Sequence, residues 1–202
     1  AIAWIKPHFQ LEGLSMSLRL VADLPSSVGQ DFIIGVVMAS IDYERSSEFV
    51  KITIDDKIIK GNSKVNNRDD YFDAYCPHAF RAFAGIDGAL FDVCNLKLKV
   101  TKQIQEVIES FFKRGEKSVK IEVSRRESTK SGSDYSSFKV TYDGCRLYDI
   151  LLTHNENSEL CLELSFSPED SVTIEMNIPS PDGKSTEKLG PITYSLQKQI
   201  LV

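Results

Sequence analysis

The tightest cluster of reactive side chains in the sequence is the segment DAYCPH, in which Cys76 and His78 stand two residues apart. A thiol and an imidazole can form a nucleophile with its base, or supply two ligands to a zinc ion. Zinc needs two further ligands, and the other histidines, His8 and His154, show no paired spacing with the remaining cysteines. A Cys/His hydrolase centred on Cys76 is therefore one hypothesis. The alternative is that Cys76 packs as a small hydrophobic residue and His78 lies in a turn.

Two other segments could hold ions or phosphates. Asp69, Asp70 and Asp73 carry carboxylates, but calcium loops space their ligands at alternate positions around a sharp glycine turn, and this run does not. The segment from Gly85 to Gly88 is too short for a phosphate cradle, and neither GxxxxGK[ST] nor GxGxxG occurs. We therefore expect no metal, no cofactor and no catalytic residue, and a protein that is not an enzyme.

The strongest local excess of positive charge lies between residues 113 and 130, which include seven basic and three acidic residues. The chain as a whole has a net charge of −5. Such a patch could bind nucleic-acid phosphates or an anionic membrane surface. Alternatively, Lys113 and Arg114 interact favourably with the dipole at a helix C-terminus, and the other basic residues only keep a loop soluble. The candidate patch consists of Lys113, Arg114, Lys117, Lys120, Arg125, Arg126 and Lys130.

Aromatic residues are dense between residues 71 and 83, without the period of a helix or a strand. Aromatic side chains are favoured at protein interfaces, so this segment is a candidate interface. It could equally cover one end of a sheet. The candidate residues are Tyr71, Phe72, Tyr75, Phe80 and Phe83.

The bulk composition is that of a folded soluble protein, with 42% hydrophobic and 26% charged residues. A length of 202 residues favours a single domain over 1–202, with a break into subdomains near 85–88 as the alternative. The longest apolar stretch, 32–39, is too short to cross a bilayer.

The four cysteines are too few for a disulfide scaffold, and the sequence has neither an Asn-x-Ser/Thr site nor the layout of a signal peptide. We therefore expect free thiols and a cytoplasmic or nuclear, intracellular setting.

Alternation of apolar and polar residues is the dominant pattern along the chain. It predicts strands at 14–20, 50–54, 96–100, 119–123, 138–142, 160–166 and 172–178, and a short final strand from Ile192. Strands with one polar face are typical of antiparallel sheets.

Two helices are predicted. Thr101 can cap a helix whose apolar residues at 104, 107, 108, 111 and 112 share one face, and Gly115 would end it. Ser27 and Gln30 have the spacing of a capping box that opens a helix over 28–40. Segments 60–70, 124–137 and 179–191 are expected to be exposed connections. The fold class is α+β: a mainly antiparallel sheet of about seven to nine strands with two packed helices.

These features favour a non-catalytic interaction or assembly module that binds protein partners and self-associates. The order of strand, helix and strand over 9–54, followed by strand, helix and two strands over 96–142, is similar to that of rhabdovirus matrix proteins, which implies a viral matrix-like structural protein. The helix at 104–112 followed by alternating strands resembles half of a sliding-clamp domain, which implies DNA handling through the basic patch. The Cys/His hydrolase is the third hypothesis.

Overall fold

The computed structural model describes residues 48–86 and 88–202. The chain divides into two compact units, 1–41 and 42–202, and the described residues all belong to the second. The strand expected at 14–20 and the helix expected at 28–40 lie outside the described residues. One domain over 1–202, with or without a break near 85–88, stays a prediction.

The described residues form strands and one helix, and every strand pairing is antiparallel. The mainly antiparallel, β-rich class is thus confirmed, whereas two packed helices are not supported. The elements are β1 (Glu48–Ile54), β2 (Lys57–Ile59), β3 (Phe72–Tyr75), β4 (Ala82–Ala84), β5 (Ala89–Phe91), β6 (Cys94–Lys99), α1 (Ile104–Phe112), β7 (Val119–Ser128), β8 (Asp134–His154), β9 (Leu160–Pro179), β10 (Thr186–Ser195) and β11 (Ile200–Leu201).

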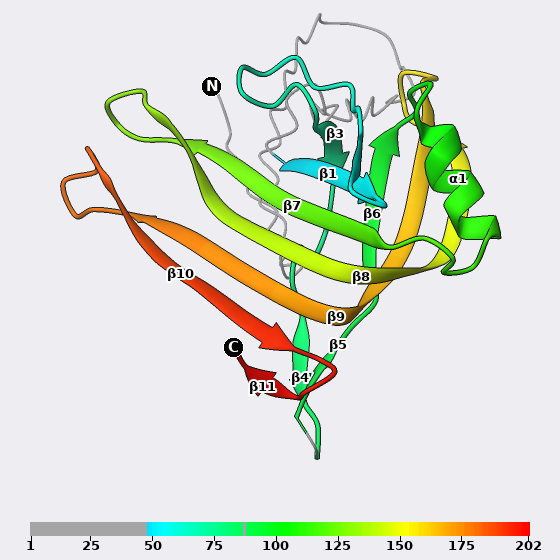
Figure 1. The fold of residues 1–202 in the computed structure, drawn as a ribbon. Coiled ribbons are helices and arrows are strands. Elements are labelled where there is room, and N and C mark those ends of the chain that lie inside the picture. Colours follow the sequence, from blue (N-terminus) through cyan, green and yellow to red (C-terminus); the bar gives the residue numbers. More distant parts are fainter. Residues whose placement is uncertain (1–47, 87) are drawn as a thin grey trace, which may run out of the picture. The chain divides into compact units, whose positions relative to one another are not determined.

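The main sheet closes on itself. Its strand order is β11-β10-β9-β6-β3-β1-β7-β8, and β8 also pairs with β9, so six strands form a closed circuit (Figure 1). β10 and β11 extend this circuit beyond β9, β2 pairs with β1, and β4 and β5 form a separate two-stranded hairpin.

The long hairpin of β8 and β9 makes the closure possible. The first part of β9 pairs with β6 up to Phe166, and its second part pairs with β10 from Ser171 onward. Pro168 lies between the two parts, where β9 pairs with β8 on one side only. Proline has no N–H, and at this position no second strand requires one. Opposite this point, β8 carries register shifts around Gly144, whose φ of 60° favours glycine. A Cβ at Gly144 would lie 2.2 Å from Asp170 Oδ2, so this residue also permits a close approach.

The core lies inside the closed sheet and follows the predicted alternation. Val50, Ile52 and Ile54 of β1 are buried, while the intervening Lys51 and Thr53 are partly exposed. The largest fully buried side chains are Tyr142, Phe49, Phe72, Phe166, Ile52, Ile59, Leu96, Leu98, Ile121, Leu162, Leu164 and Val50. They come from strands across the whole circuit, so the closed sheet and its core depend on each other.

Helix α1 lies where a helix is predicted, but it begins later than a cap at Thr101 implies. Gln103, not Thr101, is the N-cap, and no side chain caps the helix. Val107 is fully buried, whereas Phe112, expected on the buried face, is 71% exposed. Arg114, directly after the C-cap Lys113, has a φ of 51°, and Gly115 follows with a φ of 89°, so the chain enters the left-handed region one residue before the predicted glycine.

Two of the three expected connections contain strand, and the aromatic segment contains a strand that the pattern does not predict. β7 continues to Ser128 and β8 begins at Asp134, so most of 124–137 is strand. β10 begins at Thr186, inside the connection expected at 179–191, and β3 occupies part of the aperiodic aromatic segment. The ends of the β7–β8 and β9–β10 hairpins carry few apolar residues, so the alternation that reveals a strand is missing there.

Candidate assembly surfaces

Apolar side chains are exposed at the end of the sheet formed by β9, β10 and β11. β11 pairs only with Tyr194 and Ser195, which leaves most of the outer edge of β10 without a strand partner among the described residues. We call the exposed residues of this region the apolar margin: Ile178, Leu189, Ile192, Ile200, Leu201 and Val202. Lys188 and Pro191 lie in β10, and such residues discourage strand addition at an edge, so side-chain packing is the contact that this margin favours.

The β4–β5 hairpin, which we call the finger, lies next to the margin. Phe91 packs against Tyr194 of β10 with ring centroids 5.7 Å apart, and Ala89 donates its backbone N–H to Tyr194 Oη at 3.1 Å. Phe83 and Leu90 are exposed, and Ile86 near the tip is fully exposed. The finger therefore adds apolar surface beside the margin.

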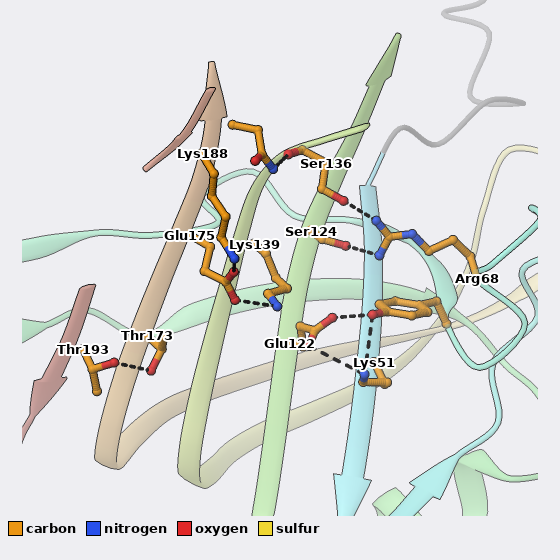
Figure 2. A network of polar contacts seen from close by, with 12 residues as sticks. Lys51, Arg68, Glu122, Ser124, Ser136, Lys139, Thr173, Glu175, Lys188 and Thr193 are labelled. Atoms are coloured by element: carbon orange, nitrogen blue, oxygen red, sulfur yellow. Dashed lines mark hydrogen bonds and ion pairs between the residues drawn. The ribbon is translucent and has the colours of Figure 1, made fainter. Parts of the chain in front are cut away.

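Polar side chains outside the core tie the strands under the margin together (Figure 2). Glu175 of β9 lies between Lys139 of β8, at 2.5 Å, and Lys188 of β10, at 2.6 Å. Hydrogen bonds from these two lysines lower the pKa of the Glu175 carboxyl. The hydroxyls of Thr173 and Thr193 join β9 to β10 at 3.0 Å. Side-chain contacts thus connect β8, β9 and β10, and the last two of these strands carry residues of the margin.

The candidate interface aromatics occupy different environments. Phe72 is fully buried in the core, whereas Tyr75, Phe80 and Phe83 are exposed. Phe80 contacts the ring of Phe91, which connects it to the finger, at a centroid distance of 5.9 Å. These residues therefore do not share one surface.

Tyr71 is half-buried and donates its phenol hydrogen to Glu122 of β7. Burial, together with the Glu122 carboxylate, raises the pKa of Tyr71 to about 12. Lys51 lies 3.6 Å from the same carboxylate, so Tyr71 belongs to a polar network between β1 and β7 (Figure 2).

The candidate basic residues are spread over two places. Lys113 and Arg114 follow α1, and Lys117 lies 3.9 Å from Asp55 before β7 begins. Lys120 lies 2.7 Å from Asp143.

The remaining three lie at the β7–β8 hairpin. Arg125 is within 4.0 Å of both Glu48 and Glu127, and Arg126 pairs with Asp134. Lys130 donates its backbone N–H to Gly183 of the β9–β10 turn. Acidic neighbours thus neutralise several of these cations.

The Cys76 environment is that of a structural thiol. Cys76 is buried, and burial raises the pKa of its thiol to about 12. Burial likewise raises the pKa of Cys94 and Cys145. A catalytic cysteine needs the opposite shift, because the thiolate is the nucleophile. Within residues 48–86 and 88–202, no group of three or more His, Cys, Asp or Glu side chains is arranged to hold a metal ion.

No helix in the described part of the chain is long and apolar enough to span a membrane.

No protein-family model and no curated protein matches this sequence. The fold, however, is similar to that of solved structures. A structure described as a type six secretion system protein is 12% identical with a TM-score of 0.57, and the match covers 76% of this chain and 99% of that one. Hcp1 from E. coli EAEC 042 is 10% identical with a TM-score of 0.55, covering 72% and 99% of the two chains. Hcp1 from Salmonella typhimurium is 9% identical with a TM-score of 0.53, covering 77% and 99%.

At these identities the similarity establishes a shared fold. The similar structures are not matrix proteins, so the expected viral matrix-like assignment is not supported. Nucleic-acid handling through the basic patch and a nuclear setting are not supported either.

Proposed function

We propose that this protein is a non-catalytic, self-associating structural subunit of a type VI secretion apparatus. The fold similarity to a type six secretion system protein, which spans 99% of that chain, supports the choice of apparatus. The observation that carries the proposal of self-association is the apolar margin, with the finger beside it.

The margin gives self-association a physical cause. Its side chains lie on adjacent strands at one end of the sheet, and Leu201 is 70% exposed. Burying apolar surface contributes about 25 cal/mol per Å², and a stable interface buries on the order of 1,200–2,000 Å² in total. The exposed apolar residues of the margin and of the finger supply the surface on which such an interface can be built.

The margin can pack against the margin of a second copy, which gives a two-fold dimer, or against a different surface of the next copy, which is a heterologous contact. A heterologous contact produces a ring when its rotation closes and a filament when it does not. Light scattering distinguishes the two arrangements, because only the heterologous contact gives assemblies larger than a dimer.

Size-exclusion chromatography with light scattering tests the proposal, at low and moderate salt, with and without a mixed oligonucleotide pool. We expect oligomers that persist at moderate salt, because apolar burial is not screened, and that do not respond to the oligonucleotides. A monomer that shifts only with oligonucleotide at low salt would contradict self-association and favour the basic patch.

Paired variants locate the interface. Leu201→Asp places a charge in the margin and should shift the population towards monomer. Leu152→Asp changes a similarly exposed leucine of β8, outside the margin, and should leave the oligomer intact. Dissociation by Leu152→Asp but not by Leu201→Asp would show that the margin is not the interface.

A further inference from the structure

A pocket of about 210 Å³ lies at the outer end of the β7–β8 hairpin, and none of its lining residues belongs to the apolar margin. One wall is the loop that precedes β3, and the other is the outer part of the β7–β8 hairpin. Its lining residues are Val65, Asn66, Asn67, Arg68, Arg126, Asp134, Tyr135 and Ser136. Two arginines, two asparagines and one aspartate therefore line this space.

Arg68 is the central cation of this pocket. Its Nη1 donates to Ser124 Oγ at 2.8 Å and its Nη2 donates to Ser136 Oγ (Figure 2). Its guanidinium also lies over the rings of Phe49, at 5.5 Å, and Tyr71, at 4.7 Å. These contacts hold the group in one position on the wall of the pocket.

The charge of Arg68 has no acidic partner: no carboxylate of the described residues lies within ion-pair distance of it. A guanidinium has five N–H donors, and two of them are used by the serine hydroxyls. Arg126, by contrast, is paired with Asp134. The pocket therefore holds a fixed positive charge with donors to spare.

Arg126 forms the opposite wall. Asp134, its partner, also accepts a hydrogen bond from Ser128 Oγ at 2.8 Å, and these contacts lower the pKa of its carboxyl. The three charged residues of the pocket sum to one positive charge, since one carboxylate faces two guanidinium groups. This local excess contrasts with the net charge of −5 of the chain.

We propose that this pocket binds a small oxyanion, a phosphate group or a carboxylate, between Arg68 and Arg126. Guanidinium groups bind both kinds of anion through paired N–H···O contacts, and the asparagine amides supply further donors. The volume suits such a group better than a drug-sized ligand, whose pockets run from about 300 Å³ upward. The site is independent of the proposed self-association.

Nuclear magnetic resonance titration at constant ionic strength tests the site, with sodium phosphate in one arm and sodium acetate in the other, against sodium chloride. We expect saturable shifts at Asn66, Asn67 and Arg68. Saturation in both arms defines an oxyanion site, saturation with phosphate alone a tetrahedral one, and saturation with acetate alone a carboxylate one. Shifts in neither arm overturn the proposal.

Three variants separate an anion site from a purely structural role. Arg126→Gln should weaken binding about tenfold or more, because a charge-assisted hydrogen bond is lost. Arg146→Gln removes the same charge from an exposed arginine that pairs with Glu169, outside the pocket, and should bind as the unchanged protein does. Asp134→Asn should strengthen binding, since it frees Arg126. Equal binding by the two arginine variants, or weaker binding by Asp134→Asn, overturns the proposal.

Discussion

The phenol oxygen of Tyr194 in β10 accepts a hydrogen bond from the backbone N–H of Ala89 in β5, at 3.1 Å. This contact joins residues 105 positions apart and fixes the turn end of the finger against β10. The same oxygen lies 2.5 Å from where a Cβ would stand on Gly88, whose φ is 146°. Gly88 and Tyr194 thus form the junction between the finger and β10.

Tyr194→Phe should loosen this junction without unfolding the protein. The ring contact with Phe91 is retained, and the lost hydrogen bond costs about 0.5–1.5 kcal/mol of unfolding free energy. Amide hydrogen exchange at Ala89 should accelerate. Tyr148→Phe is the control, because the Tyr148 hydroxyl is exposed and has one long contact, 3.4 Å to Ser167. Unchanged exchange at Ala89 would show that the finger is held by packing alone.

Helix α1 offers a test of burial on a single element. Val107→Asp places an unpaired carboxylate in the core and should cost several kcal/mol, enough to unfold the domain. Phe112→Asp, on an exposed position of the same helix, should leave it folded. Circular dichroism and urea unfolding measure both. A folded Val107→Asp protein would contradict the described packing of α1.

Cys76 should behave as a buried structural thiol. Because the pKa of Cys76 is raised to about 12, its thiolate is scarce at neutral pH. Iodoacetamide at pH 8 should therefore label it slowly, at a rate limited by opening of the structure, and rapidly after denaturation in urea. Mass spectrometry of the labelled peptide measures this rate. Fast labelling in the folded protein would revive the hydrolase hypothesis.

Glu175 should make stability depend on pH on the acidic side. Its folded pKa is lowered from 4.5 by Lys139 and Lys188, so its contribution is present above pH 4.5 and is lost as the pH falls through the folded pKa. Glu175→Gln should cost about 0.5–1 kcal/mol at pH 7 and weaken this dependence.

Glu169→Gln is the matched control for Glu175, because Glu169 is more exposed and lies 3.6 Å from one arginine. Thermal unfolding between pH 3 and 7 measures both variants. The same pH dependence in Glu175→Gln and the unchanged protein would mean that this ion pair contributes nothing.

The sequence predicts the fold best where one face of an element is buried. Val50, Ile52 and Ile54 alternate with polar residues, and the resulting strand is where the pattern indicates. The prediction fails at the outer hairpin ends, because residues such as Arg126 and Ser128 lie in the outer part of β7, where both faces of the strand are polar. The alternation of apolar and polar residues thus indicates that one face of a strand is buried, and it is absent from strands that bury neither face.

The closure of the sheet and the pocket could not be predicted from local patterns. Arg68 meets Ser124 and Ser136 only because β7 and β8 pair beside the loop that carries it. Likewise, nothing near Glu175 in the sequence indicates Lys139 as its partner, since their pairing depends on the register of β8 and β9. Such relationships are set by tertiary register, which a single sequence leaves open.

The change of partners along β9 has a kinetic consequence. The β8–β9 hairpin pairs residues that are close in sequence, beginning with His154 and Leu160 at its turn. Its strands can therefore pair early in folding. The β6–β9 ladder instead links Cys94 to Phe166 and closes a long loop, whose entropy must be lost before the contacts form. We expect the hairpin to fold first and the circuit to close in the rate-limiting step. Changes near Leu96 or Leu164 should then alter the folding rate more than changes at the tip of the finger.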